Sequence, residues 1–123
     1  SFDASGPTDM FLTNNYILFP DNRQYLGVYD VTTPANPTEI GRFGKGYPEA
    51  DNDSYQMDAQ GSMAYVAVGQ DGINLLNFSD INNTYIEQTI ATPNSGDTRD
   101  VKKMGAFIYA ADLTNGLMVY IEE

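Results

Sequence analysis

The stretch GQDGINLLNFSD, residues 69–80, places an Asp-Gly pair directly before a short apolar run. Near the end of the chain, LTNGLMVYIEE at residues 113–123 repeats this arrangement, with Asn-Gly in place of Asp-Gly. Both pairs favour tight hairpin turns, because glycine adopts a positive φ angle without steric cost. The apolar runs that follow have the length and composition of β-strands. The chain therefore contains a turn-and-strand unit at least twice.

A longer comparison extends this unit into a repeat. Residues 56–78 align with residues 100–122 at a shift of 44 positions, and a third copy with small length changes starts near Asp9. The matching pairs of the two later copies are Gly61 with Gly105, Tyr65 with Tyr109, Gly72 with Gly116 and Leu75 with Val119. The sequence thus predicts three repeats, near residues 9–55, 56–99 and 100–123.

Each repeat is expected to consist of strands. AYVAV at 64–68 and FIYAAD at 107–112 are short, apolar and rich in Ala, Val and Tyr, as buried strands are. A further strand is expected in the first two repeats, at TEIGRF (38–43) and TYIEQTI (84–90). Gly and Pro interrupt every window long enough for a helix. The expected class is all-β.

Four short antiparallel strands in a repeat of about 45 residues are typical of a β-propeller blade. Residues 1–123 are therefore interpreted as a single propeller segment of about three blades. The third repeat lacks its fourth strand, and residues 1–8 are a candidate to complete it. Propellers usually close with four to eight blades. Further blades are thus expected from the same longer chain or from a second copy.

Composition and charge exclude several functions. The chain has 17 acidic and six basic residues and a net charge of −11, which disfavours nucleic acid and anionic membranes as partners. It contains no Cys and no His, so thiol catalysis, a His-based triad and Cys/His zinc sites are excluded. No run of about 18 apolar residues is present, so membrane insertion is not expected.

Asp97, Arg99 and Asp100 in GDTRD form the first candidate site. They stand where the innermost strand of the third repeat begins, and in propellers this point lies near the central channel. A ligand-binding site at the end of the channel is one interpretation. A structural Asp–Arg pair that fixes the turn is the other.

A second candidate site is EADNDS, residues 49–54, which places Glu49, Asp51 and Asp53 at alternate positions. Hard cations such as calcium require several oxygen ligands on a loop. A solvated polar loop explains the same residues. We therefore expect no cofactor, with calcium as the one candidate.

Three stretches of the chain resemble the LVIVD family of β-propeller repeats. They are YLGVYDVTTPANPTEIGRF at 25–43, GSMAYVAVGQDGINLLNFSD at 61–80 and GDTRDVKKMGAFIYAADLTNGLMVY at 96–120. The hallmark is an apolar strand that ends in Asp and is followed by a Pro-x-Asn-Pro connection, which Asp30 and TTPANP match. The resemblance implies a bacterial protein that is secreted or lies at the cell surface. Most members have no established activity.

The expected function is that of a non-catalytic, extracellular or cell-surface module for binding or scaffolding. It would present loops from a rigid propeller to a protein or a glycan. Two alternatives remain open: a carbohydrate-active hydrolase that uses loop carboxylates, and a calcium-stabilised surface domain. Paired carboxylates about 5 to 10 Å apart would be needed for the hydrolase.

Overall fold

The computed structural model describes residues 9–45 and 54–122. Three antiparallel sheets account for the fold, so the all-β class is confirmed. Sheet A comprises β1 (Phe11–Thr13), β2 (Tyr16–Pro20), β3 (Tyr25–Asp30) and β4 (Thr38–Gly44). Sheet B comprises β5 (Met57–Gln60), β6 (Met63–Ala67), β7 (Ile73–Asn77) and β8 (Tyr85–Ile90). Sheet C comprises β9 (Thr98–Met104), β10 (Phe107–Asp112) and β11 (Gly116–Ile121).

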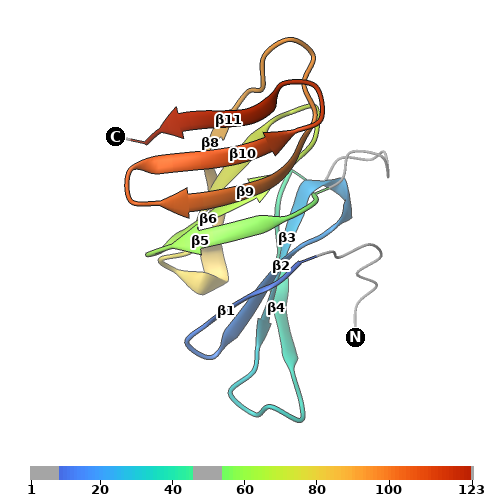
Figure 1. Cartoon of the computed structure of the whole chain (residues 1–123). Coiled ribbons are helices and arrows are strands. Elements are labelled where there is room, and N and C mark those ends of the chain that lie inside the picture. The colour runs from blue at the N-terminus through green and yellow to red at the C-terminus, as the bar shows by residue number, and fades with distance from the viewer. Residues whose placement is uncertain (1–8, 46–53, 123) are drawn as a thin grey trace.

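Every strand pairs with its neighbour in the sequence, so each sheet is a meander of consecutive hairpins (Figure 1). Sheets A and B each contain one 3₁₀ turn in a connection between strands. These are η1 (Asn22–Gln24), between β2 and β3, and η2 (Ile81–Asn83), between β7 and β8. In the described part of the chain, no helix has the length and apolar character needed to cross a bilayer. The fourth strand that sequence reasoning assigned to residues 1–8 lies outside the described residues.

The first hairpin of each sheet turns in the same way. Its two-residue turn occupies residues 14–15, 61–62 and 105–106 in sheets A, B and C. The first residue of each turn has a positive φ: 51° at Asn14, 62° at Gly61 and 59° at Gly105. The register also shifts at corresponding places in sheets A and B, between Val28 and Tyr29 and between Leu75 and Leu76. One backbone design is therefore used repeatedly.

The Asp-Gly and Asn-Gly pairs differ from expectation. Ala67 pairs with Ile73 and Asp112 with Gly116, so the connections contain residues 68–72 and 113–115. Gly72 is the last residue of its connection and Gly116 is the first residue of β11, so neither lies at the centre of a two-residue turn. Both have the expected positive φ, +96° and +74°, and the N–H of Gly72 closes a turn by donating to the carbonyl of Gly69. Position 72 has no space for a side chain, because an added Cβ would lie 2.0 Å from the carbonyl oxygen of Ile90.

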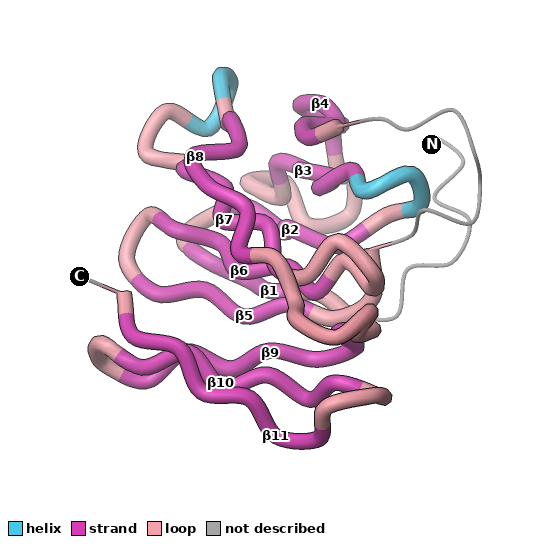
Figure 2. Tube along the Cα trace, turned by 90° about the horizontal axis from the view of Figure 1, so that it is seen from above, coloured by secondary structure: helices cyan, strands magenta, loops and turns pink. Residues whose placement is uncertain are grey.

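The sheets stack in the order A, B, C, with β1, β5 and β9 adjacent along one side of the stack (Figure 2). Sheet B lies in the middle and buries both of its faces. Between sheets A and B lie Leu18, Leu26, Val28, Met57, Ala64, Val66, Val68 and Leu76. Between sheets B and C lie Tyr65, Ala67, Ile73, Leu75, Val101, Ile108 and Ala110. Apolar burial between sheets therefore holds the stack together.

Polar contacts fix how sheet C sits on sheet B. The carboxylate of Asp58 accepts a 2.8 Å hydrogen bond from the backbone N–H of Lys103. The Tyr65 hydroxyl donates to Glu122, and the Lys103 ammonium lies 3.1 Å from the same carboxylate. These directional bonds set the register of two sheets that apolar contact alone would leave free to slide.

Candidate functional site

The candidate site lies where β9 begins, next to the start of β5. Gly69 and Thr98 exchange two backbone hydrogen bonds of 2.9 Å, which tie the β6–β7 connection to the first residue of β9. Gly69 has a φ of +65°, and a Cβ there would lie 3.0 Å from the ring of Tyr55. A side chain at Gly69 would therefore be strained by the positive φ and would press on the Tyr55 ring.

A β-bulge at the start of β9 aims Arg99. Asp112 pairs with Thr98 and Ala111 pairs with Asp100, so Arg99 is the extra residue between them. Tyr55 holds the corresponding place in sheet B, since Tyr55 and Gln56 both hydrogen-bond the backbone of Ala67. Bulges re-aim side chains in this way and are common beside functional sites.

Arg99 and Asp97 form a two-pronged ion pair. The Arg99 Nε and Nη2 atoms lie 2.7 and 2.8 Å from the two carboxylate oxygens of Asp97. The guanidinium carbon lies 4.2 Å from the centre of the Tyr55 ring, which adds a cation–π contact. The hydrogen bonds that Arg99 donates to Asp97 raise the pKa of Arg99. Arg99 is thus a fixed cation, and 42% of its side chain remains exposed.

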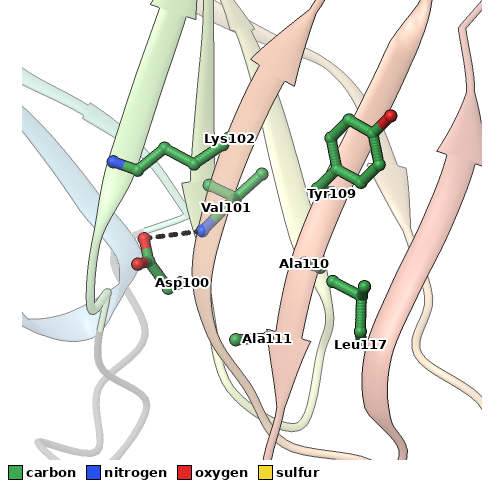
Figure 3. Close-up of a pocket in the computed structure, with 7 residues that line it drawn as sticks. All are labelled: Asp100, Val101, Lys102, Tyr109, Ala110, Ala111 and Leu117. Atoms are coloured by element: carbon green, nitrogen blue, oxygen red, sulfur yellow. Dashed lines mark hydrogen bonds between the residues drawn. The ribbon is translucent and has the colours of Figure 1, made fainter.

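Asp100 does not join this pair. Its Oδ1 accepts a 2.8 Å hydrogen bond from the backbone N–H of Val101. When the Gln56 amide is turned by 180°, its nitrogen donates to both Asp100 oxygens, at 2.9 and 2.8 Å. Asp100 borders a shallow hollow on the free face of sheet C together with Tyr109 and Leu117 (Figure 3). The three residues of the predicted site therefore divide into the Asp97–Arg99 pair and a separate Asp100.

Asp112 organises this end of the molecule, and sequence reasoning missed it. It is only 5% exposed, yet it accepts hydrogen bonds from both of the connections that flank β9–β10. The donors are the backbone N–H groups of Asp97, Thr114 and Asn115 and the hydroxyls of Thr92 and Thr98. The signal in the sequence was an Asp that ends a strand directly before Leu-Thr-Asn-Gly, a pattern that favours a side-chain-capped turn.

Burial by itself would raise the pKa of Asp112. The hydrogen bonds from the Thr92 hydroxyl and from the backbone N–H groups outweigh that effect and hold the pKa well below the usual value of 3.8. Asp112 is therefore ionised at neutral pH, and the hydrogen bonds that it accepts hold the two flanking connections in place.

A second buried polar cluster lies between sheets A and B. Gln24 donates a 2.7 Å hydrogen bond to Asp71, and Asn74 accepts one of 2.8 Å from Thr89. Asp21 is fully buried and lies 3.7 Å from Arg42. Sequence reasoning did not single out these residues, because their burial depends on how the sheets stack.

The predicted calcium ligands Glu49, Asp51 and Asp53 lie outside the described residues, so that site stays a prediction. Among residues 9–45 and 54–122, no three acidic side chains gather as metal ligands would.

The connection after β3 carries the feature that identifies the chain. Asp30 accepts a 2.8 Å hydrogen bond from the N–H of Thr32, and Asn77 accepts one of 2.9 Å from Ser79 at the matching place in sheet B. The family model of the LVIVD repeat matches residues 7–44 and 95–120. The chain belongs to the LVIVD-repeat family. The two LVIVD matches contain sheet A and nearly all of sheet C, while sheet B between them has the same strand order.

Two solved structures that are similar to this LVIVD-repeat chain are designed proteins. The computationally designed Ika8 protein aligns with a TM-score of 0.67 at 7% identity, over 94% of this chain and 33% of its own. The computationally designed Ika4 protein aligns with a TM-score of 0.56 at 6% identity, over 99% and 94%. The chain thus spans about one third of the Ika8 chain. At such identities the likeness concerns the fold alone, which is propeller-like. A search of curated proteins found no match.

Proposed function

We propose that this LVIVD-repeat chain is a non-catalytic binding or scaffolding module, secreted or displayed at the cell surface. Its sheets would be the four-stranded blades of a propeller, and its loops would present a rigid surface to a protein or glycan partner. The observation that carries the proposal is the state of the carboxylates at the start of β9.

Each carboxylate at this end is already engaged. Asp97 is paired with Arg99, Asp100 accepts a hydrogen bond from the N–H of Val101, and Asp112 accepts hydrogen bonds from hydroxyls and backbone N–H groups on both sides of it. A glycosidase needs one carboxylic acid that keeps its proton near neutral pH, and this requires a raised pKa. At Asp112, the hydrogen bonds from Thr92 and from backbone N–H groups hold the pKa below its usual value. The geometry therefore favours binding over hydrolysis.

The Asp97–Arg99–Tyr55 cluster is the surface best prepared for a partner. Two of the five guanidinium N–H groups of Arg99 bind Asp97, and the half-exposed side chain offers the others in a fixed direction. Because the ion pair and the Tyr55 ring hold the guanidinium, little side-chain entropy would be lost on binding. This is the rigid presentation that the proposal requires.

An array of immobilised glycans and extracellular matrix proteins tests the proposal, with a chromogenic glycoside panel run in parallel. We expect saturable binding by the wild type that Arg99→Ala lowers by at least tenfold. Arg23→Gln is the matched control, because Arg23 is an exposed arginine in the turn η1 between β2 and β3, and the variant should bind normally. Turnover of any glycoside with a two-carboxyl pH profile would refute the non-catalytic proposal.

The proposed location rests on the family resemblance. Fractionation of cells of the source organism, followed by immunoblotting, should find the protein in the medium or the surface fraction. Recovery only from the cytosol would contradict this part of the proposal.

A further inference from the structure

The hairpin turns after β1, β5 and β9 allow the joint between sheets A and B to be compared with the joint between sheets B and C. Asn14, Gly61 and Gly105 hold the same place in these turns, with φ angles of 51°, 62° and 59°. The residue before the turn is Thr13 in sheet A and Gln60 in sheet B. Because the backbone is alike, differences between the two joints at this place come from the side chains.

At the joint between sheets B and C, the side chain of Gln60 bridges the two sheets. Its Nε2 atom donates a 3.1 Å hydrogen bond to the carbonyl of Gly105, and its Oε1 atom accepts one of 3.2 Å from the N–H of the same residue. The Lys103 ammonium donates to that carbonyl as well. One carboxamide thus binds a backbone donor and a backbone acceptor that the turn leaves outside the strand ladder.

At the joint between sheets A and B, this bridge is missing. Thr13 stands in the place of Gln60, and its short side chain carries no carboxamide. Within residues 9–45 and 54–122, no protein group bonds the N–H or the C=O of Gly61, which correspond to the two groups of Gly105 that Gln60 binds. The joint between sheets A and B therefore leaves open a donor and an acceptor that the other joint uses internally.

A cavity of about 240 Å³ lies at this open place. Its apolar wall includes Tyr16 and Phe78, which pack on the core between sheets A and B. Its rim is polar and includes Thr13, Asn14 and Ser62 beside Gly61. None of the lining residues is charged, although the chain has a net charge of −11. The cavity thus combines an aromatic wall with a neutral, hydrogen-bonding rim.

The polar groups around the cavity are available to a ligand. Among the residues that the structure describes, the side chains of Thr13, Asn14, Tyr16 and Ser62 make no hydrogen bond to another protein group. Their hydroxyl and amide groups offer both donors and acceptors. The pairing of Thr13 with Tyr16 holds the turn on the side of sheet A in place, so part of the site is ordered before a ligand arrives.

We propose that this cavity binds one neutral sugar unit, at a site separate from Arg99. Neighbouring hydroxyls of a sugar place a donor and an acceptor side by side, as the Gln60 carboxamide does, and would bind the N–H and C=O of Gly61. The rings of Tyr16 and Phe78 suit the apolar C–H face of a sugar.

Charge and size narrow the class of ligand. An ionic group would lose its hydration without meeting a charged partner, so the uncharged lining favours a neutral ligand. The volume of about 240 Å³ is below the roughly 300 to 1,000 Å³ of pockets for drug-sized ligands. A single ring fits this space, and the rest of a longer glycan would extend into solvent.

Amide NMR spectra of the isotope-labelled protein test the proposal, with the methyl glycosides of glucose, mannose and galactose as probes. We expect at least one of them to shift the N–H resonance of Gly61 saturably, together with those of Asn14 and Ser62. If none of the three probes shifts the Gly61 resonance, the proposal is wrong.

Thr13→Gln supplies in sheet A the carboxamide that sheet B has at this place. Its side chain should bind Gly61 in place of the sugar and weaken sugar binding by about tenfold or more. Ser62→Ala, which introduces the residue that Ala106 provides in sheet C, removes one hydroxyl and should weaken binding less. Thr114→Gln is the matched control, because Thr114 is exposed in the connection after β10 and does not line the cavity. Wild-type affinity in both cavity variants would overturn the proposal.

The same spectra distinguish a sugar from a peptide. A primary carboxamide on an Asn or Gln side chain could bind Gly61 as Gln60 binds Gly105, so acetamide and N-acetylglutamine amide are tested beside the glycosides. Binding of these amides without any glycoside would refute the sugar and indicate a peptide. Arg99→Ala should leave the sugar-induced shift of Gly61 unchanged, so the cavity and the Arg99 surface can fail separately. Loss of that shift in Arg99→Ala would contradict the cavity site.

Discussion

Asp112 shows how one buried carboxylate can order two loops. It joins the connection before β9 to the turn after β10, because donors from both segments converge on its two oxygens. The nearest donor oxygen, that of Thr92, is 2.6 Å away. Hydrogen bonds to a charged acceptor are about twice as strong as neutral ones. This single residue therefore sets the shape of the end of the molecule that carries Arg99.

Replacing Asp112 by Asn should lower the free energy of unfolding by about 3 kcal/mol at pH 7, since an amide cannot accept all of these hydrogen bonds and leaves buried donors unsatisfied. Because the pKa of Asp112 is lower in the folded state, its stabilisation is present above the unfolded pKa of about 3.8 and is lost as the pH falls below it. The difference between wild type and variant in urea unfolding should therefore narrow below pH 4.

Asp80→Asn provides the control for this prediction. Asp80 caps η2 with exposed hydrogen bonds of 3.3 and 2.9 Å to Asn82 and Asn83. Its replacement should cost less than about 1 kcal/mol. A pH-independent loss in Asp112→Asn would mean that the shape of the side chain matters and its charge does not.

At the scale of the element, a comparison of two glycines distinguishes the effect of backbone strain from that of lack of space. Both have a positive φ, but only one is crowded by its neighbours. Gly61 has a φ of +62° in the β5–β6 turn, and a Cβ there would meet nothing within 4 Å. Gly72 has a φ of +96°, and a Cβ there would clash with the carbonyl of Ile90. The second glycine is required for β8 to lie against the start of β7.

Gly72→Ala should therefore destabilise the protein by more than about 3 kcal/mol, because strain and overpacking add. Gly61→Ala should cost only about 1 to 2 kcal/mol, the price of a left-handed conformation alone. Equilibrium unfolding in urea measures both. Equal losses would show that the contact with Ile90 relaxes freely.

The elements could largely be predicted from the sequence, because alternation and β-rich runs are local signals. The strands expected at 64–68 and 107–112 begin within one residue of β6 and β10. The turns were predicted less well. The two-residue turns follow β1, β5 and β9, whereas the conspicuous Asp-Gly pair at 71–72 ends a longer connection. A glycine in the sequence does not reveal whether φ or a neighbouring carbonyl requires it.

The candidate site was predicted in part for the same reason. Asp97 and Arg99 are two residues apart, and their pairing is a local event that the sequence could indicate. The bulge that leaves Arg99 without a partner residue in β10 depends on the strand pairing of Thr98 with Asp112, fourteen positions away. No local pattern places Asp100 on another surface, or Tyr55 beneath the guanidinium. Tertiary stacking decides both.

At the scale of the whole molecule, the stack behaves as a one-dimensional array in which each sheet contacts only its neighbours. Sheet B has two neighbours, and sheets A and C have one each within a single copy. The number of sheets could be predicted from the period of the sequence.

The strictly sequential order of the sheets also governs how the chain emerges from the ribosome. At about 5 to 20 residues per second, each new sheet follows the last after roughly 2 to 9 seconds. Every strand pairs with a neighbour that has just been made, so no sheet waits for a distant segment. Each sheet shields the apolar face left by its predecessor and exposes its own. During synthesis, the exposed apolar face of the newest sheet is therefore the surface on which a chaperone would be needed.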